Sequence, residues 1–192
     1  MSVCTSIEEA RKNTKEILEG KFKSSHQVVL EEFLEGEELS YFVIADKNSY
    51  HFFGSAQDHK RVGEGDTGPN TGGMGTYSDA DHSLPFLTDE DIVQAQEINN
   101  ATVKALKNKF ADGYKGILYG GFMATANGVK LIEYNARFGD PEAMNVLSLL
   151  ESDFIEICNG IADGSLNKVD VNFSNKATVC KYAVPEGYPN NP

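Results

Sequence analysis

The sequence predicts an α+β fold, in which helices flank a mainly antiparallel sheet. Two pairs of apolar segments carry this prediction, because a short turn joins the members of each pair and favours a hairpin. The pairs cover residues 39–45 with 50–55 and residues 116–125 with 129–135. Helices do not separate every strand from the next, so a doubly wound parallel sheet is not expected.

Two helices are predicted from the residues that cap them. Ser6 precedes an amphipathic segment over residues 7–18, which Gly20 ends. Thr88 precedes a longer segment over residues 89–109, with apolar residues at helical spacing. A hydroxyl side chain at such a place accepts a backbone N–H group that the first helical turn leaves unpaired.

The first half of the chain also contains strands and one long glycine-rich segment. We expect an apolar strand at residues 28–32, and the Asp-Lys-Asn-Ser run at 46–49 is the turn of the first hairpin. Residues 58–78 are rich in Gly, Thr and Asn and are expected to form one long loop. A loop of this length is unusual in a compact domain and is often functional.

The second half is predicted to end in two helices and a strand. The Ala-Asn-Gly run at 126–128 is the turn of the second hairpin. Pro141 opens a helix that runs through Leu150, because proline suits the first helical turn. Ser152 is expected to cap a further helix, and residues 177–184 form a closing strand.

Composition and charge exclude several classes of protein. The 192 residues are 40% hydrophobic and 24% charged, which is ordinary for a globular domain with one sizeable core. A net charge of −12 argues against a nucleic-acid partner, although a small phosphate-bearing substrate needs only local positive charge. No apolar run approaches the roughly 20 residues of a membrane span, and no signal-peptide pattern opens the chain.

The cysteines predict reduced thiols and a cytoplasmic location. Cys4, Cys158 and Cys180 are odd in number, scattered, and not spaced with the four histidines as metal ligands. Cys158 and Cys180 lie in apolar patterns, where core packing is expected. His59 is the histidine that falls inside a candidate site.

The first candidate site joins a charged run to a glycine-rich run. Residues 57–61 read Gln-Asp-His-Lys-Arg, and residues 68–75 contain four glycines. Asp58, Lys60 and Arg61 are suited to a substrate with both amine and phosphate groups. Glycine backbone can approach an anion closely because no Cβ intervenes. A plain surface loop also explains such a run, but its length and mixed charges favour a site.

The second candidate site lies at the end of the predicted strand 129–135. Side chains alternate along a strand, so Glu133, Asn135 and Arg137 are expected to share a face. A carboxylate and an amide oxygen suit a hard cation such as Mg²⁺, and an arginine suits a carboxylate or phosphate. Spacing alone also fits a solvated polar face on which Arg137 pairs with Glu133.

The third candidate is residues 28–38, where an apolar segment runs into a hinge and then an acidic cluster. The hinge backbone can pair with a planar base, and a following acid can bind ribose hydroxyls. An acidic turn between two strands explains the same pattern.

Four stretches in this order resemble one family. They are EEFLEGEE (31–38), QDHKRVGEGDTGPNTGGMG (57–75), GILYGGFM (116–123) and EYNARFGDPE (133–142). Together they are similar to the phosphoribosylamine–glycine ligase family, or glycinamide ribonucleotide synthetase, which belongs to the ATP-grasp enzymes. The VPEGYP tail also resembles the opening of that family's last domain. The resemblance implies a partial ATP-grasp fold.

The resemblance implies a nucleotide and metal site. Backbone groups of the hinge hold adenine, and Glu38 or its neighbour Glu37 binds the ribose. The residues implied in ATP binding are Glu31, Glu32, Leu34, Glu37 and Glu38. Glu133 and Asn135 match the pair that binds Mg²⁺ or Mn²⁺ on the ATP phosphates. The strand Leu118–Phe122 lacks the additional metal-binding acid of many ATP-grasp enzymes.

The resemblance also implies the substrates, glycine and 5-phosphoribosylamine. ATP would phosphorylate the glycine carboxylate, and the amine would then displace phosphate to give glycinamide ribonucleotide. Arg137 and Lys60 match catalytic positions. The residues implied in substrate binding are Asp58, Arg61, Asn70, Thr71, Gly72, Gly73 and Asp140.

The chain is similar to the central part of such an enzyme, without the N-terminal domain and most of the C-terminal domain. We expect residues 1–32 to be a remnant of the small ATP-grasp subdomain, 33–168 the main subdomain, and 169–192 the start of the last domain. The chain alone is expected to be inactive, and a monomer or weak homodimer. A non-catalytic nucleotide-binding fragment, or another ATP-grasp ligase of purine synthesis, is the alternative.

Overall fold

The computed structural model describes residues 3–21 and 27–191. The chain divides into two compact units, residues 1–35 and residues 36–192, and each is described by itself. Within the described ranges no helix has the length and apolar character needed to cross a membrane.

The described part of the first unit contains helix α1 (Ile7–Glu16), which continues into a π-helical turn η1 (Ile17–Lys21). The predicted cap is confirmed, because the Ser6 hydroxyl accepts the N–H of Glu9 at 3.1 Å. Gly20 has a φ of 106°, a left-handed conformation that few other residues adopt, and the helical path ends there.

The predicted strand at residues 28–32 is wrong. Residues 27–35 contain neither helix nor strand. Val29 and Leu30 are 81% and 74% exposed, so their apolar side chains are not packed on a core. A strand needs a neighbour for its backbone hydrogen bonds, and no described strand pairs with this segment.

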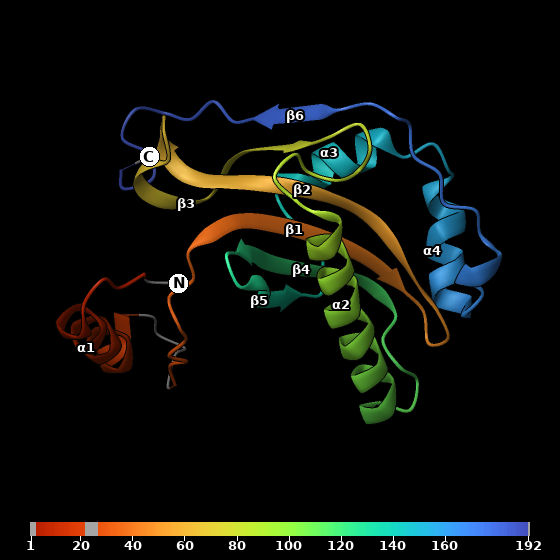
Figure 1. The fold of residues 1–192 in the computed structure, drawn as a ribbon, viewed down its shortest axis with the longest axis horizontal. Helices are drawn as coiled ribbons and strands as arrows, with labels where there is room; N and C mark the ends of the chain where they lie inside the picture. The colour runs from red at the N-terminus through yellow and green to blue at the C-terminus, as the bar shows by residue number, and fades with distance from the viewer. Residues whose placement is uncertain (1–2, 22–26, 192) are drawn as a thin grey trace. The chain divides into compact units, whose positions relative to one another are not determined.

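The second unit is built on a six-stranded antiparallel sheet in the order β5-β4-β1-β2-β3-β6 (Figure 1). Both predicted hairpins are confirmed, and so is the α+β fold class. The strands are β1 (Gly36–Ala45), β2 (Tyr50–Gly63), β3 (Thr67–Ser78), β4 (Gly116–Thr125), β5 (Gly128–Asn135) and β6 (Thr178–Lys181).

The predicted long loop at residues 58–78 is also wrong. Strand β2 continues to Gly63, and β3 begins four residues later at Thr67, so most of the segment is a two-stranded ribbon. β3 in turn pairs with β6, which is shorter than the predicted strand 177–184. A glycine-rich segment with weak strand propensity is held extended here by pairing with β2, and its end at Gly75–Ser78 also pairs with β6.

The helices of the second unit follow their predicted ranges closely. Thr88 caps the longest helix with a capping box, in which Asp91 bonds back to the N–H of Thr88. The cap of the last α-helix is Asp153, because the predicted cap Ser152 instead bonds the backbone of Asp170 and Asn172. The helices are α2 (Asp89–Lys109), α3 (Glu142–Leu149), α4 (Phe154–Asp163) and the 3₁₀ turn η2 (Leu166–Lys168).

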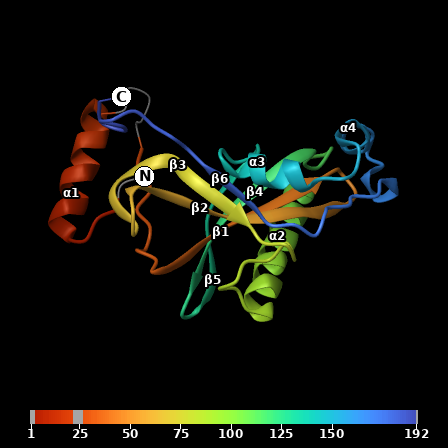
Figure 2. The same ribbon diagram turned by 90° about the horizontal axis from the view of Figure 1, so that it is seen from above.

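Helices cover both faces of the sheet, and α2 lies on the face opposite α3 and α4 (Figure 2). Alternation along β1 supplies both cores. Leu39 and Tyr41 pack with Ala95 of α2, whereas Phe42 and Ile44 pack with α3 and α4 residues such as Val146 and Ile157. Any residue of β1 is therefore assigned to a face by whether its number is odd or even.

The cysteines are free thiols, as predicted from their number and spacing. Cys158 and Cys180 are half-buried and belong to neither core cluster, so their predicted core packing is only partly right.

Candidate active site

The sheet register places several predicted site residues on one face. Glu133 is paired with Gly121 on β4, and Gly121 is paired with Ser40 on β1. Directly paired residues project to the same face, so this row lies on the face that α3 and α4 cover. A Cβ at Gly121 would have no neighbour closer than Glu133 Cγ at 3.8 Å. The glycine thus leaves the Glu133 side chain uncrowded on this row.

The predicted common face of Glu133, Asn135 and Arg137 is supported by their hydrogen bonds. The Asn135 amide donates to Glu133 Oε1 at 3.0 Å. Arg137 donates to Asn135 Oδ1 at 3.2 Å and to the carbonyl of Phe138 at 2.8 Å. Arg137 thus bonds to the amide and not, as spacing alone also allowed, to the carboxylate.

The donor chemistry of this pair fits a hard cation. Glu133 is exposed and offers a carboxylate. Asn135 offers an amide oxygen, which accepts a hydrogen bond from the long side chain of Arg137 in this structure. The described residues contain no group of three His, Cys, Asp or Glu arranged for a metal. A cation held here would therefore depend on ligand oxygens, such as phosphates, for the rest of its coordination.

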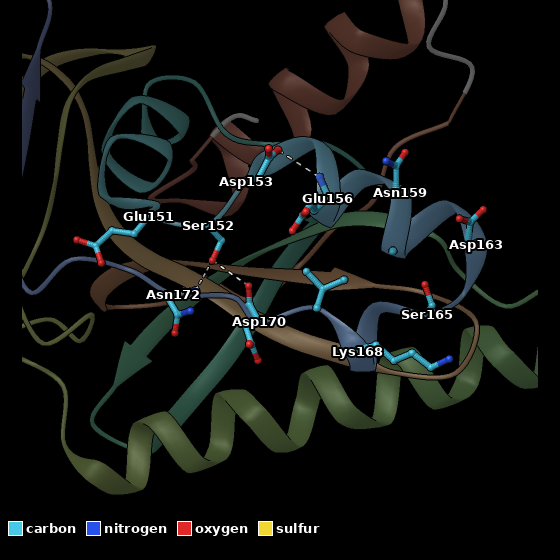
Figure 3. Close-up of a pocket in the computed structure, with 12 residues that line it drawn as sticks. Glu151, Ser152, Asp153, Glu156, Asn159, Asp163, Ser165, Lys168, Asp170 and Asn172 are labelled. Atoms are coloured by element: carbon cyan, nitrogen blue, oxygen red, sulfur yellow. Dashed lines mark hydrogen bonds between the residues drawn. The ribbon is translucent and has the colours of Figure 1, made fainter.

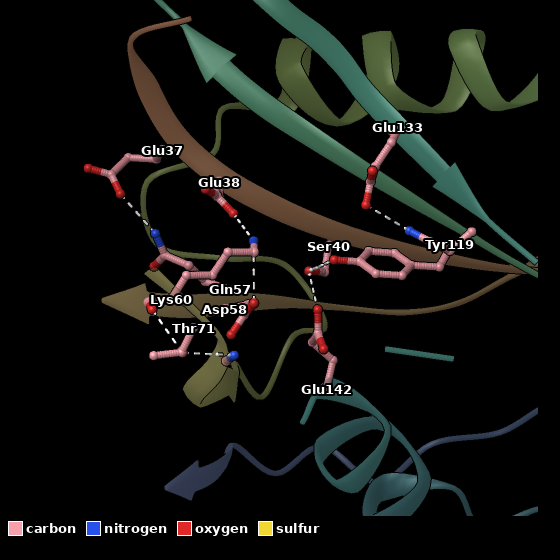
Figure 4. Close-up of polar contacts among 12 residues, drawn as sticks. Glu37, Glu38, Ser40, Gln57, Asp58, Lys60, Thr71, Tyr119, Glu133 and Glu142 are labelled. Atoms are coloured by element: carbon pink, nitrogen blue, oxygen red, sulfur yellow. Dashed lines mark hydrogen bonds and ion pairs between the residues drawn. The ribbon is translucent and has the colours of Figure 1, made fainter. Parts of the chain in front are cut away.

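Lys60 lies between two carboxylates on the same face of the sheet (Figure 4). Its ammonium is 3.3 Å from Asp58 Oδ2 and forms a second ion pair with Glu38. Burial alone would lower the pKa of Lys60, but the hydrogen bond and charge of Glu38, with the charge of Asp58, outweigh it and raise the pKa. Lys60 is thus a fixed positive charge at this end of the site.

Asp58 is 6% exposed, and only one of its oxygens has a partner. Its Oδ1 atom is buried without a hydrogen bond. Burial raises the pKa of Asp58 to about 6; Lys60 opposes this rise, and the nearby charges of Glu142 and Glu38 add to it. In this structure the predicted amine ligand faces protein, not an open pocket.

The predicted charged run is divided by strand alternation. Lys60 points to the site face, whereas Arg61 donates to the carbonyl of Gly68 at 2.7 Å, within the β2–β3 ribbon. Asn70 is the residue paired with Arg61 across that ribbon. The structure therefore does not bring Lys60 and Arg61 together around one ligand.

The glycine-rich run shapes the site through close packing. Thr71 donates its hydroxyl to the Lys60 carbonyl at 2.9 Å and accepts the N–H of Gly73 at 3.1 Å. Gly73 has a φ of 146°, and a Cβ there would lie 3.0 Å from Asp58 Oδ1. Gly72 has no atom within 4 Å of its Cβ position, so it borders open space.

Glu37 and Glu38, both predicted near the ribose, face opposite sides of the sheet. Glu37 accepts from Gln57 at 2.8 Å on the α2 side, and Glu38 pairs with Lys60 on the other (Figure 4). Only Glu38 lies with the other candidate residues. The hinge residues Glu31, Glu32 and Leu34 belong to the first unit, where they lie in irregular backbone.

Sequence reasoning missed a buried polar network at the base of this face. Glu142 is 2% exposed and accepts the Ser40 hydroxyl at 2.8 Å, and Ser40 lies 3.1 Å from the Tyr119 hydroxyl (Figure 4). Burial and the charge of Glu142 raise the pKa of Tyr119. Glu142 stands in the GDPE stretch, but its sequence position indicated only the start of a helix.

The larger of the two described pockets lies elsewhere. It has a volume of about 690 Å³ and is lined by residues of α4, η2 and the adjoining loops (Figure 3). Its ionisable side chains are five carboxylates and Lys168. An acidic lining repels phosphate, and none of the predicted site residues lines this pocket.

Comparison with known proteins identifies the family. Residues 1–143 match the family model described as phosphoribosylglycinamide synthetase, ATP-grasp (A) domain. The phosphoribosylamine–glycine ligase of Methanosarcina barkeri is 54% identical over 97% of this chain and 42% of its own length. That of Methanocaldococcus jannaschii is 55% identical over 96% and 41%. The chain thus spans about two fifths of the length of these relatives.

Solved structures agree with this assignment. The phosphoribosylamine–glycine ligase of Thermotoga maritima superposes with a TM-score of 0.68 at 28% identity, over 84% of this chain and 39% of its own. The biotin carboxylase domain of Hydrogenobacter thermophilus 2-oxoglutarate carboxylase, in complex with MgADP, ADP and bicarbonate, has a TM-score of 0.61 at 19% identity, over 93% and 37%. The second likeness supports the fold alone. The chain belongs to the phosphoribosylglycinamide synthetase family, and its residues 1–143 match the ATP-grasp domain of that family.

Proposed function

We propose that the chain is the ATP-grasp part of a ligase that joins glycine to 5-phosphoribosylamine, giving glycinamide ribonucleotide, ADP and phosphate. One observation carries the proposal: Glu38, Lys60, Glu133 and Asn135 share one face of the sheet, in a chain 54% identical to a ligase of this name. The reaction belongs to purine synthesis and, by this proposal, to the cytoplasm.

Glu133 and Asn135 would hold Mg²⁺ or Mn²⁺ in this proposal. When bound, the cation would neutralise negative charge on the phosphates of ATP. Glu38 would bind the ribose, and backbone groups of residues 31–34 would bind adenine. Because Arg137 now bonds to the Asn135 oxygen, it would have to turn from that atom when the cation binds.

The reaction would need two transfers. A glycine carboxylate oxygen would first attack the γ-phosphorus of ATP, whose bond to the β–γ bridging oxygen breaks as ADP leaves. This step is needed because a free carboxylate is a poor electrophile for an amine. The phosphoribosylamine nitrogen would then attack the carbonyl carbon, lose a proton, and release phosphate. Such catalysis consists mostly of positioning and charge neutralisation, which Lys60 and Arg137 would provide.

Several groups would seat the substrates. Arg137 would bind the glycine carboxylate and its phosphorylated form. Asp140 would bind the amine of the same glycine. Asp58 and the backbone and side chains from Arg61 to Gly73 would line the remaining substrate site. The glycyl phosphate hydrolyses readily, so water must be kept out of the site. The β2–β3 ribbon, which the structure has in place of the predicted long loop, would do this.

The same proposal includes a domain arrangement. Residues 1–32 would be a remnant of the small ATP-grasp subdomain, residues 33–168 the main subdomain and residues 169–192 the start of a further domain. The change of compact unit near residue 35 supports the first boundary. Because the chain spans 42% of the M. barkeri relative, we propose that it binds ATP weakly and is inactive alone, as a monomer or weak homodimer.

A chimera tests the function. The matching segment of the M. barkeri ligase is replaced by residues 3–188 of this chain, and glycine-dependent ADP formation is measured with freshly generated phosphoribosylamine. Turnover within about tenfold of the parent ligase supports the proposal, because misplaced groups can cost several powers of ten in rate. A folded chimera that binds ATP but shows no glycine-dependent turnover would favour a nucleotide-binding segment without catalytic function.

A further inference from the structure

Strand β6 is attached to α3 and the loop before it by alternate side chains. The Asn145 amide donates to the Thr178 carbonyl at 3.0 Å and to its hydroxyl at 3.2 Å. Two residues later, Cys180 Sγ lies 3.9 Å from Met144 Sδ. Two residues later again, the Tyr182 hydroxyl donates to Asp140. Every second residue from Thr178 onward therefore contacts a residue that lies earlier in the chain, first in α3 and then in the loop 139–141.

Tyr182 connects two parts of the candidate site. Its N–H donates to the carbonyl of Met74 at 2.9 Å, in the glycine-rich part of β3. Its hydroxyl holds Asp140 Oδ1, and this bond to Asp140 raises the pKa of Tyr182 to about 12. The bond from Tyr182 is the one hydrogen bond that described residues give to the Asp140 carboxylate. Because Asp140 is exposed, its other oxygen is open to a ligand.

Tyr182 lies beyond the residues that match the ATP-grasp domain model. That match ends at residue 143, whereas β6 and Tyr182 lie some forty residues later. A phenylalanine at position 182 would keep the ring and the backbone bond to Met74, and would lose only the bond to Asp140.

We propose that Tyr182 is a positioning residue, which holds Asp140 with one oxygen occupied and the other directed to the amine of a substrate. The inference rests on the proposed function, because Asp140 acts there as an amine ligand. It adds a residue from the segment after the matched domain, directly beyond the end of β6.

Amide hydrogen exchange on the ligand-free chain tests the contact itself. The Ala143 and Met144 N–H groups bond to the carbonyls of Gly139 and Pro141 and report on the loop. We expect Tyr182→Phe to speed their exchange by about tenfold, since a bond to a charged group is lost. The matched control is Tyr188→Phe, because the Tyr188 hydroxyl makes no hydrogen bond with a described residue. Unchanged exchange in Tyr182→Phe would overturn the proposal and leave the proposed function standing.

A double-mutant cycle on glycine affinity separates positioning from general support. Glycine is titrated by calorimetry into the chimera with the M. barkeri ligase, in the presence of Mg²⁺ and a non-hydrolysable ATP analogue. Tyr182→Phe should weaken glycine binding by about tenfold, and Asp140→Asn should weaken it as well. The double variant should bind glycine as tightly as Asp140→Asn alone. Affinity for the ATP analogue should stay within about twofold.

The outcomes of the cycle are distinct. Additive losses, or equal losses for glycine and the ATP analogue, would mean that Tyr182 only supports the fold, against the proposal. Absence of glycine binding by the unmodified chimera would count against the proposed function, and the substrate role of Asp140 and Tyr182 would fall with it.

Discussion

Gly73 and Pro141 are packed so closely that residue 73 has no room for a side chain. A Cβ at Gly73 would lie 2.5 Å from Pro141 Cδ, and its φ of 146° is rare for other residues. We therefore expect Gly73→Ala to lower the free energy of unfolding by about 1–3 kcal/mol. Urea denaturation measures this loss.

Gly72→Ala is the matched control for that prediction. Gly72 is the preceding residue, and nothing lies within 4 Å of its Cβ position. Its substitution should change stability by less than about 0.5 kcal/mol. Equal effects of the two variants would show that the contact with Pro141 does not constrain the fold.

The pKa of Asp58 predicts a pH dependence of stability. In the unfolded chain its carboxyl ionises near 3.8, but burial raises the folded pKa to about 6. Between these values the folded state holds the extra proton, so the free energy of unfolding falls as pH rises from about 4 to about 6. Asp58→Asn removes this dependence, and its stability relative to the unmodified chain should rise by about 1–3 kcal/mol across that window.

Urea titrations at pH 4, 5, 6 and 7 check the prediction for Asp58. Asp112→Asn is the control, because Asp112 is exposed and makes no hydrogen bond with a described residue. A difference between Asp58→Asn and the unmodified chain that is constant with pH would contradict the raised pKa.

Helix α2 is tied to β5, the strand of Glu133 and Asn135, by Asn99. This residue is fully buried, donates to the Ala95 carbonyl at 3.0 Å, and accepts the Tyr134 hydroxyl at 2.8 Å. Asn99→Ala removes the bond from the Tyr134 hydroxyl and the bond to the Ala95 carbonyl, and we expect a loss of about 1–3 kcal/mol in thermal or urea unfolding. Asn108→Ala, at an exposed position of the same helix, should be nearly neutral.

The parts of the fold that were predicted correctly depend on local signals. Ser6 and Thr88 cap helices through contacts within four residues, and the turn at 46–49 is held by Asp46 side-chain bonds to Asn48 and Ser49. Such bonds are encoded next to one another in the chain. The ribbon β2–β3 was missed because its glycine-rich sequence has weak strand propensity, and the pairing of its end at Gly75–Ser78 with β6 joins residues about a hundred positions apart.

The candidate site divides in the same way. The shared face of Glu133, Asn135 and Arg137 follows from the period of two along one strand. The buried bond from Ser40 to Glu142 spans 102 residues, so no local pattern indicates it. The alternation of side chains along β2 also places Lys60 and Arg61 on different faces, although the two residues are adjacent in the sequence.

Glu133 and Asn135 are the two proposed ligands of the cation. Glu133 is exposed, and its one hydrogen bond comes from Asn135, so its carboxylate contributes little to stability. We expect Glu133→Gln and Asn135→Ala to change the free energy of unfolding by less than about 0.5 kcal/mol. In the chimera with the M. barkeri ligase they should lower turnover by at least about a hundredfold, because charge neutralisation by a bound cation is worth several kcal/mol.

Steady-state turnover over a range of Mg²⁺ concentrations, beside urea denaturation of the same variants, measures both effects. Glu64→Gln is the control, since it makes the same chemical change at an exposed residue between β2 and β3. Raising Mg²⁺ should recover part of the activity of Asn135→Ala, which keeps the carboxylate, and less of that of Glu133→Gln. If both variants matched the parent at saturating Mg²⁺, the pair would be a solvated polar face of β5, and the cation would have to be held by other groups.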